Sequence, residues 1–324
     1  MSGPPFLDAD AIRAAVPIAE MVDAVEAAYR DVAAGRDRSP LRSHVALDEG
    51  DLLLMPGVRT GAAGASVKLV TVIPGNAARG RPTVQAIVAW FEATTGEPVA
   101  LLDGPMLTAM RTGAASGVAT RLLAREDAAT LALIGAGAQA EWQVHAVLAV
   151  RPIERVLVCS RSSESRDRFA QALGQSVPAE VVAVPDVEAA VREADVVCCA
   201  TTSSEPVFEA SWLRPGAHVN GIGAFRLGMI ELPPELFAAA SVLAVDARAA
   251  AMAEAGDLVA AIERGLVAEG DLIEIGSVEP GWAATRDPEA ITAFKSVGLA
   301  IQDVAAAELI VTRLLGARLA QPLE

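Results

Sequence analysis

The hydrophobic pattern of the first hundred residues changes from a helical period to a strand period. Between residues 11 and 34, apolar positions recur at helical spacing, which predicts a pair of amphipathic helices. After a polar break at residues 35–40, short apolar runs separated by turn residues predict an antiparallel or mixed sheet that extends to about residue 102. The predicted strands are residues 44–47, 52–55, 65–73 and 84–91, and a long alanine-rich helix is predicted at residues 104–124.

From residue 130 onward, strand-like apolar runs alternate with helical segments. Strands joined by crossover helices form a parallel, doubly wound sheet, so this region predicts an α/β domain of the Rossmann type. A last alanine-rich helix, predicted at residues 296–315, is expected to pack on the first, α+β domain. The strands are predicted at residues 130–134, 155–159, 180–184, 195–200, 217–221 and 241–245, with helices at 141–150, 163–173 and 187–193.

The first strand of the alternating region runs directly into a glycine-rich turn with GxGxxA spacing. Gly135 permits a tight turn, Gly137 lets a pyrophosphate approach the backbone, and Ala140 lets the following helix pack closely on the strand. Ala138 and Gln139 complete the turn, and the helix N-terminus beyond them offers free N–H groups to phosphates. A simple tight turn could have the same spacing, but the flanking strand and helix favour a dinucleotide site.

The end of the second strand of this region indicates which dinucleotide binds. An acidic residue at this position would accept hydrogen bonds from the ribose 2′-hydroxyl of NAD, but none is present. Ser160, Arg161 and Arg166 lie there instead, and a hydroxyl with guanidinium groups suits a 2′-phosphate. The alternative is a basic loop that faces solvent. We therefore favour NADP(H) as the cofactor and keep NAD(H) as possible.

Composition and charge exclude several classes of function. The chain of 324 residues is 52% hydrophobic and 21% charged, which is typical of a globular protein. Its formal net charge of −15 argues against a nucleic-acid partner, because such partners require a basic face. The sequence shows no secretory signal pattern and no apolar run of the ~20 residues that a membrane span needs. We expect a cytoplasmic protein with no membrane partner.

Cysteine and histidine positions give no metal or disulfide site. Cys159, Cys198 and Cys199 lie in strand-like runs, and an odd number at this spacing makes no disulfide framework. We expect all three to be buried. The three histidines are scattered, and no cluster of His, Cys and carboxylate residues has metal-ligand spacing.

Three cations interrupt apolar segments of the first domain. Lys68 lies within a predicted strand, Arg111 within the predicted long helix, and Arg42 begins a strand. Burial of a lysine or arginine is unfavourable unless the cation meets an anion. Together, and near a nicotinamide, these residues would bind an anionic substrate, most simply a carboxylate. The alternative is a set of structural ion pairs with Asp48, Glu92 or Asp103.

Several short segments, in order, resemble those of the ornithine cyclodeaminase/mu-crystallin family. The resemblance covers nearly the whole chain, and the matching order is more specific than any one motif. It implies a homodimer in which residues 1–112 plus 299–324 form the substrate-binding and dimerisation domain and residues 113–298 form the inserted Rossmann NAD(P)-binding domain. The matching segments are residues 67–69, 73–76, 95–98, 107–114, 134–140, 220–223, 254–257 and 294–298.

The resemblance also implies roles for individual residues. Arg42, Lys68 and Arg111 match the positions that hold the substrate carboxylate, and Val297 matches a position beside the substrate. Members of the family include ornithine cyclodeaminase, some alanine dehydrogenases, and NAD(P)H-dependent reductases of ketimines and of Δ1-pyrroline-2-carboxylate. The positions around the cofactor are matched by Thr83, Thr112, Ala138, Gln139, Thr201 and Ser296, with Gly223 in the glycine-rich loop.

One departure from the family pattern selects among these activities. Cyclodeaminases carry a catalytic Asp shortly after the glycine-rich loop, and Phe225 occupies that position here, with no carboxylate before Glu231. Ornithine cyclisation needs a general base, which Phe cannot supply. Phe225 would instead form an apolar wall for a cyclic imine, or simply pack under the nicotinamide.

The sequence therefore predicts an NADPH-dependent reductase of cyclic imino acids that yields a cyclic amino acid such as L-proline. Arg42 and Arg111 would clamp the substrate carboxylate, and Lys68 would polarise it or donate a proton. The alternatives are an ornithine cyclodeaminase that releases proline and ammonia, an alanine-dehydrogenase-like enzyme, and a non-catalytic NADP(H)-binding protein of the mu-crystallin kind.

Overall fold

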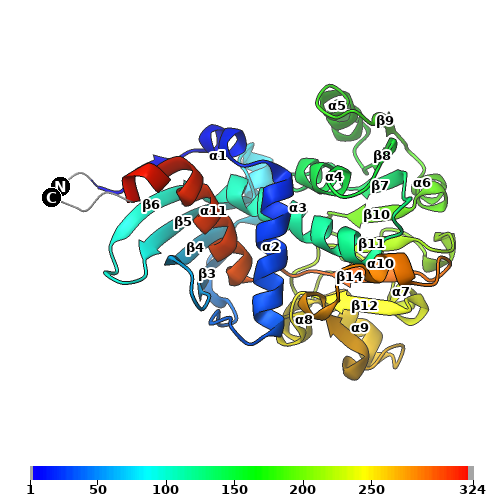
Figure 1. Cartoon of the computed structure of the whole chain (residues 1–324). Coiled ribbons are helices and arrows are strands. Elements are labelled where there is room, and N and C mark those ends of the chain that lie inside the picture. Colours follow the sequence, from blue (N-terminus) through cyan, green and yellow to red (C-terminus); the bar gives the residue numbers. More distant parts are fainter. Residues whose placement is uncertain (1–2, 320–324) are drawn as a thin grey trace. The chain divides into compact units, whose positions relative to one another are not determined.

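A computed structural model describes residues 3–319 of the chain (Figure 1). The described residues divide into two compact units. The first unit contains the residues up to Arg111 and those from Leu299 onward, and the second is Thr112–Gly298. The division lies within helix α3, Gly104–Leu123, which closely matches the long helix predicted from the sequence.

The first unit is built on a six-stranded mixed sheet, where the sequence predicted an antiparallel or mixed sheet and four of its strands. The sheet has the order β1-β6-β5-β4-β3-β2, in which β1 pairs parallel to β6 and the other neighbours are antiparallel. β1 and β6 were not identified individually from the sequence, because two residues and a brief apolar run carry no clear period. The strands are β1 (Phe6–Leu7), β2 (Ser43–Leu47), β3 (Gly50–Val58), β4 (Gly64–Val72), β5 (Val84–Glu92) and β6 (Pro98–Asp103).

Helices α1 (Ala9–Ala15), α2 (Ile18–Ala33) and α11 (Ala300–Leu319) complete the first unit, with a 3₁₀ turn, η1, at Pro74–Arg79. The N-terminal helix pair was predicted. The terminal helix α11 packs on α2 and on β4, as expected, and Figure 1 shows the two helices side by side. Ile301 and Ala305 of α11 form a small core with Ala28 of α2.

The predicted start of the terminal helix at residue 296 was wrong. Residues immediately before it form strand β14 (Thr292–Lys295), and Gly298 has a φ of +80°. A left-handed residue cannot continue a right-handed helix, so α11 begins only at Ala300.

The second unit contains an eight-stranded, fully parallel sheet, which confirms the predicted doubly wound fold. Its order is β13-β12-β14-β11-β10-β7-β8-β9. β7 lies between β8 and β10, so the chain direction across the sheet reverses there, and this reversal is the point at which such sheets bind ligands. The strands are β7 (Thr130–Ile134), β8 (Arg155–Cys159), β9 (Glu180–Ala183), β10 (Val196–Cys199), β11 (His218–Gly221), β12 (Val242–Val245), β13 (Leu272–Glu274) and β14.

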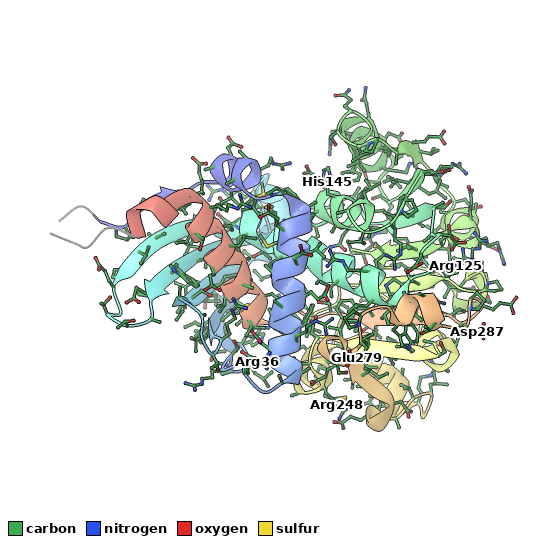
Figure 2. The ribbon with its side chains drawn as sticks, in the orientation of Figure 1. Arg36, Arg125, His145, Arg248, Glu279 and Asp287 are labelled. Atoms are coloured by element: carbon green, nitrogen blue, oxygen red, sulfur yellow. The ribbon has the colours of Figure 1, made fainter. Side chains whose placement is uncertain are left out.

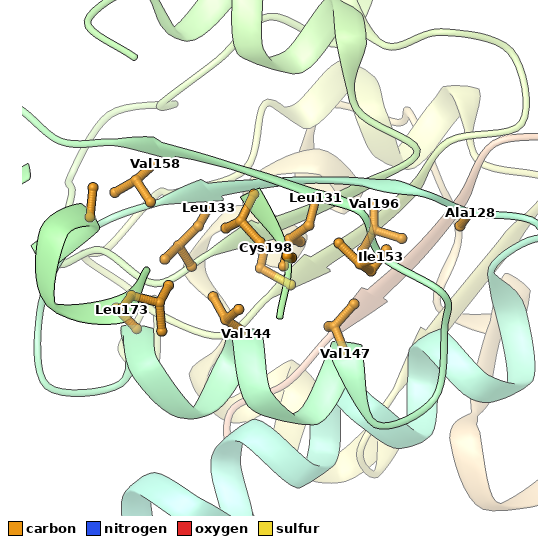
Figure 3. Close-up of a cluster of buried hydrophobic side chains, with 14 of the residues drawn as sticks. Ala128, Leu131, Leu133, Val144, Val147, Ile153, Val158, Leu173, Val196 and Cys198 are labelled. Atoms are coloured by element: carbon orange, nitrogen blue, oxygen red, sulfur yellow. The ribbon is translucent and has the colours of Figure 1, made fainter. Parts of the chain in front are cut away.

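Helices pack around this parallel sheet, and the apolar layer beneath α4 is shown in Figure 3. Leu131, Leu133 and Cys198 from the strands contact Val144 and Val147 of α4 in this layer. The three cysteines are buried, as predicted, and burial raises the pKa of Cys198 to about 12. The helices are α4 (Ala140–Leu148), α5 (Ser163–Leu173), α6 (Val187–Glu193), α7 (Pro234–Ala239), α8 (Arg248–Glu254), α9 (Gly256–Glu263) and α10 (Trp282–Thr285), with 3₁₀ turns η2 (Ala210–Trp212), η3 (Glu269–Asp271) and η4 (Ile275–Ser277).

Candidate functional site

The glycine-rich turn after β7 has the geometry that a dinucleotide site requires. Gly135 has a φ of +112°, and a Cβ at this position would lie 2.5 Å from the carbonyl oxygen of Ala200, so only glycine fits. The space around Gly137 is open, and Ala138 beside it is exposed. Gln139 is the N-cap of α4 but makes no capping hydrogen bond, and its Oε1 atom is buried without a partner. The uncapped N–H groups at the start of α4 fit a bound pyrophosphate, whose oxygens would accept from them.

The residues predicted to select NADP(H) lie at the carboxyl end of β8, next to β7 in the sheet. Arg161 is exposed, and Ser160 is half-buried. The Nε atom of Arg166 lies 2.8 Å from a carboxylate oxygen of Asp167, which is itself 59% exposed. Arg161 thus follows the strand end where the ribose of a dinucleotide binds in this fold. Arg166 lies on α5, close enough to β8 for its charge to act on the pKa of Cys159.

Loops after β10 and β11 approach each other closely, and a buried carboxylate joins them. Oε1 of Glu231 accepts a hydrogen bond from Thr201 N at 2.5 Å, and Oε2 accepts one from Gly223 N at 2.8 Å. A Cβ at Gly223 would lie 2.0 Å from the carbonyl oxygen of Thr201, so the contact needs glycine. Burial raises the pKa of Glu231, and the nearby charge of Lys295 opposes that shift. Sequence reasoning did not identify this role for Glu231.

A second buried charge pair holds the loop that carries Phe225. Nζ of Lys295 donates to the carbonyl oxygen of Ala224 at 2.8 Å and lies 3.2 Å from Asp257. Phe225 itself is half-buried, and the guanidinium of Arg226 lies 5.3 Å from its ring centroid. Phe225 thus lies on a loop whose backbone is held by the hydrogen bond from Lys295 to Ala224.

Asp246, at the end of β12, orders the segment that connects β14 to α11. Its Oδ2 atom accepts hydrogen bonds from the Ser296 hydroxyl at 2.9 Å and from the amides of Val297 and Gly298, both at 2.7 Å. The Ser296 hydroxyl therefore donates to Asp246, and only its lone pairs remain for another group. This role of Asp246 was not predicted, because it lies 50 residues before Ser296 in the chain.

In the first unit, Lys68 and Arg111 share one carboxylate, that of Asp303 on α11. Nζ of Lys68 lies 2.9 Å from Oδ1 and 2.7 Å from Oδ2, and Nε of Arg111 lies 3.0 Å from Oδ1. The side chains of Lys68 and Asp303 are 1% and 0% exposed. Two of the carboxylates considered as alternative partners contact other groups, because Glu92 binds the turn at Thr95 and Asp103 caps α3.

The environment of Lys68 favours its neutral form far more than water does. Burial lowers the pKa of Lys68 to about 7, and the charge of Arg111 lowers it further, whereas Asp303 opposes the shift. Arg42, which lies one residue before β2, also lowers it. An amine with a pKa near 7 can both hold and release a proton at neutral pH.

Arg111 is held on two sides. Its Nη1 atom lies 3.2 Å from Oε1 of Gln302, which also accepts from Leu299 N, and the Gln302 amide donates to the Tyr29 hydroxyl at 2.6 Å. These contacts involve Nε and Nη1 of Arg111, and the Arg111 side chain keeps 7% of its exposure.

The predicted site residues divide between the two units. Arg42, Lys68, Thr83 and Arg111 lie in the first, where the Thr83 carbonyl pairs with Ile73 N just before β5. The second unit contains Thr112, Gly135, Gly137, Ala138, Gln139, Ser160, Arg161, Arg166, Thr201, Gly223, Phe225, Ser296 and Val297.

Within residues 3–319, no group of three or more His, Cys, Asp or Glu side chains is arranged to hold a metal ion. His145, labelled in Figure 2, lies on α4 beside Glu141, 3.8 Å from its carboxylate. None of the described helices is long and apolar enough to span a membrane.

The sequence profile of the ornithine cyclodeaminase/mu-crystallin family matches residues 4–318. The chain belongs to this family. A Δ1-pyrroline-2-carboxylate reductase of Bacillus cereus is 39% identical over 313 residues, which cover 95% of this chain and 96% of the relative.

Two solved structures of similar proteins hold a nicotinamide dinucleotide. The Δ1-pyrroline-2-carboxylate reductase of Thermococcus litoralis, in complex with NADH and L-proline, superposes with a TM-score of 0.90 at 32% identity and covers 98% of this chain and 99% of its own. An archaeal alanine dehydrogenase dimer with bound NAD has a TM-score of 0.87 at 31% identity, with 99% of both chains covered. The fold of this family member is thus that of NAD-binding oxidoreductases.

Proposed function

We propose that this protein is an NAD(P)H-dependent reductase of cyclic imino acids of the Δ1-pyrroline-2-carboxylate type, which yields a cyclic amino acid such as L-proline. The observation that carries the proposal is the cluster in the first unit, where Lys68 and Arg111 share a single buried carboxylate. With Arg42 close enough to lower the Lys68 pKa, the cluster retains positive charge for an anionic substrate. The similarity to Δ1-pyrroline-2-carboxylate reductases supports a carboxylate beside a C=N bond.

The proposed roles follow from the chemistry of each side chain and from its position in the cluster. Arg42 and the N–H groups of Arg111 that do not donate to Asp303 or Gln302 bind the substrate carboxylate. Lys68 donates a proton to the imine nitrogen and becomes neutral, which its lowered pKa permits. Bound NAD(P)H supplies the hydride that the imine carbon accepts. Phe225 provides an apolar surface for the ring, and Val297 lies beside it.

The proposed cofactor contacts lie in the second unit, with the exception of Thr83. The turn from Gly135 to Gln139 holds the pyrophosphate, and Thr201 and Gly223 support the nicotinamide end. Contacts from Thr83, Thr112 and Ser296 are proposed from the family resemblance. Ser160, Arg161 and Arg166 favour NADP(H), with NAD(H) as the alternative that both solved relatives hold.

The carboxylate that serves as the general base of cyclodeaminases is absent from its position in this chain. Phe225 replaces the family's Asp, and the next carboxylate, Glu231, has one oxygen on Thr201 N and the other on Gly223 N. A carboxylate with both oxygens committed to backbone amides is a structural group, since its burial removes it from exchange with a substrate amine.

We also propose that the protein is a homodimer. One face of the six-stranded sheet is apolar and partly open, with Leu69 40% exposed and paired in register with Leu54 and Ile87. An open apolar face of this kind is typical of an interface. The related archaeal alanine dehydrogenase is a dimer.

The proposed function is tested by following the absorbance of NADPH and NADH with a panel of substrates. We expect oxidation with Δ1-pyrroline-2-carboxylate or Δ1-piperideine-2-carboxylate, and a lower KM for NADPH than for NADH. Lys68→Met should lower kcat by about 10²–10⁴-fold, the range for loss of a general acid. Arg79→Met, which removes an exposed cation paired with Glu49, is the control and should leave kcat unchanged.

Other results would contradict the proposal. Ammonia release from ornithine without net cofactor consumption would indicate a cyclodeaminase, and NADH formation from alanine would indicate an amino-acid dehydrogenase. Tight NADP(H) binding without turnover of either imine would indicate a binding protein. Equal affinity for the two cofactors in a fluorescence titration would remove the preference for NADP(H).

A further inference from the structure

Asp303 is the acidic centre of the cluster in the first unit. Its two oxygens face Lys68 from β4 and Arg111 from α3, although these residues lie 235 and 192 positions earlier in the chain. The carboxylate is fully buried, so solvent does not screen its charge from the two cations. Asp303 therefore orients the Lys68 amine and the Arg111 guanidinium before a substrate binds to them.

We propose that Asp303 is a positioning residue for Lys68 and Arg111, whose carboxylate orients both cations and holds on the Lys68 amine the proton that imine reduction consumes. This inference rests on the proposed function only for the use of the proton. The orientation of the two cations follows from the contacts themselves.

The chain contains very few lysines, and this supports a role for Lys68 in releasing a proton, which an arginine could not perform. Of the 26 basic residues, only Lys68 and Lys295 are lysines, and the remainder are arginines. Both lysines are buried among charged partners. Arginine stays protonated in proteins, whereas a buried amine can lose its proton, so a site that must release a proton requires lysine.

The direction of the effect of Asp303 on Lys68 follows from its charge. Burial, Arg111 and Arg42 all favour the neutral amine, and Asp303 is the group that opposes them. Without its negative charge, the pKa of Lys68 falls below its present value of about 7. A proton required at neutral pH would then be absent from most molecules.

The two-lysine sequence permits a direct test by NMR on the full-length protein. Labelling with [ε-¹³C]lysine gives two signals, and Lys68→Arg leaves only that of Lys295, which assigns the spectrum. In wild-type protein we expect the Lys68 signal to titrate near pH 7. In Asp303→Asn the midpoint should fall by about one pH unit or more, and Asp303→Glu should restore it in part.

A control on the same helix separates this effect from general damage to α11. Glu308→Gln removes a carboxylate that binds Arg59 and Ala63 N, outside the Lys68 cluster, and should leave the Lys68 midpoint unchanged. An unchanged midpoint in Asp303→Asn, or an equal shift in Glu308→Gln, would overturn the proposal. Should Asp303→Asn fail to fold, Asp303→Glu provides the test. A Lys68 midpoint near pH 10.5 in that variant, the ordinary value for a lysine, would also overturn the proposal.

Kinetics provide the functional readout. In Asp303→Asn, the limb of kcat/KM that requires protonated Lys68 should move to lower pH, so that activity at pH 7 falls several-fold while activity at the low-pH plateau is retained. A merely structural role would lower the rate at every pH by the same factor. If the NMR midpoint shifts as expected but no imine is reduced, the positioning role stands and the proposed function fails.

Discussion

At the scale of single residues, His218 shows how burial fixes a protonation state. The ring lies in the centre of the parallel sheet, with Nδ1 3.0 Å from the Thr292 hydroxyl and Nε2 3.1 Å from the side-chain oxygen of Asn220. Burial lowers the pKa of His218 to about 3, more than its hydrogen bond to Asn220 can oppose. The histidine is therefore neutral in the folded protein throughout the mildly acidic range.

This shift predicts a loss of stability in acid. Between pH 6.5 and about 3, the unfolded chain binds a proton at His218 that the folded chain does not, so the free energy of unfolding decreases as pH falls. At pH 5 the contribution is about 2 kcal/mol. Urea unfolding of wild type and His218→Gln at pH 7 and pH 5 measures it, and the variant should lose less stability than wild type over this range.

The control for this prediction is His44→Gln, which removes a histidine from exposed strand β2. Its stability should follow that of wild type from pH 7 to pH 5. If wild type and His218→Gln lose the same free energy of unfolding between pH 7 and pH 5, the conclusion that His218 is neutral in the folded protein is wrong.

Sequence reasoning identified the buried cations but not the anion that joins them. Lys68 and Arg111 were recognisable because each interrupts an apolar segment. Asp303 carries a similar signal, since it follows Gln302 and precedes Val304 in an otherwise largely apolar helix. Its partners could not be deduced, because the contacts span 235 and 192 residues and depend on the packing of α11 against the sheet. Glu231 and Asp246 were missed because they bind mainly backbone amides, between 8 and 52 residues away, which no local pattern reveals.

At the scale of elements, close approach between helices depends on glycine. A Cβ at Gly113 on α3 would lie 2.3 Å from the carbonyl oxygen of Trp142 on α4, so the two helices are in backbone contact there. Gly316 on α11 also lies inside a helix, but a Cβ there meets its nearest neighbour, a Thr312 methyl, only at 4.0 Å. The same substitution should therefore have opposite effects at the two sites.

Gly113→Ala should lower the free energy of unfolding by about 1–3 kcal/mol, because the backbone of Trp142 must shift to admit the methyl group. Gly316→Ala should raise it by up to about 1 kcal/mol through helix propensity. Urea denaturation of the two variants tests both. Equal changes of the same sign would show that the tight packing of α3 on α4 does not determine stability.

The elements that the sequence predicted were those with a sustained period. α5, α6 and β8 matched their predicted ranges, because each has a cap or a continuous apolar run. β14 was missed although it lies between β11 and β12 in the sheet. Its residues Thr292–Lys295 include two polar side chains that are buried and paired only in the folded protein, and no local pattern reveals them.

At the scale of the whole molecule, each unit has a core of its own but the first leaves one sheet face uncovered. Alternation along β4 places Lys68 and Val70 on the buried side and Leu69 on the open side. Leu69 pairs with Leu54 and Ile87 across the neighbouring strands, so the open side is a continuous apolar surface. In a protein with a net charge of −15, such a surface is more consistent with an interface than with solvent exposure.

This surface predicts the outcome of a single charge substitution. Leu69→Asp places a carboxylate at the centre of the proposed interface, where its desolvation opposes association, and should convert the dimer to a monomer in light scattering at micromolar concentration. Leu227→Asp is the matched control, since Leu227 is 57% exposed in a loop of the second unit and should leave the dimer intact. Because Leu69 points away from Lys68 along β4, the monomer should retain the Lys68 titration near pH 7. A monomeric wild type, or a Leu69→Asp variant that remains dimeric, would show that the open face of the sheet is not the contact between subunits.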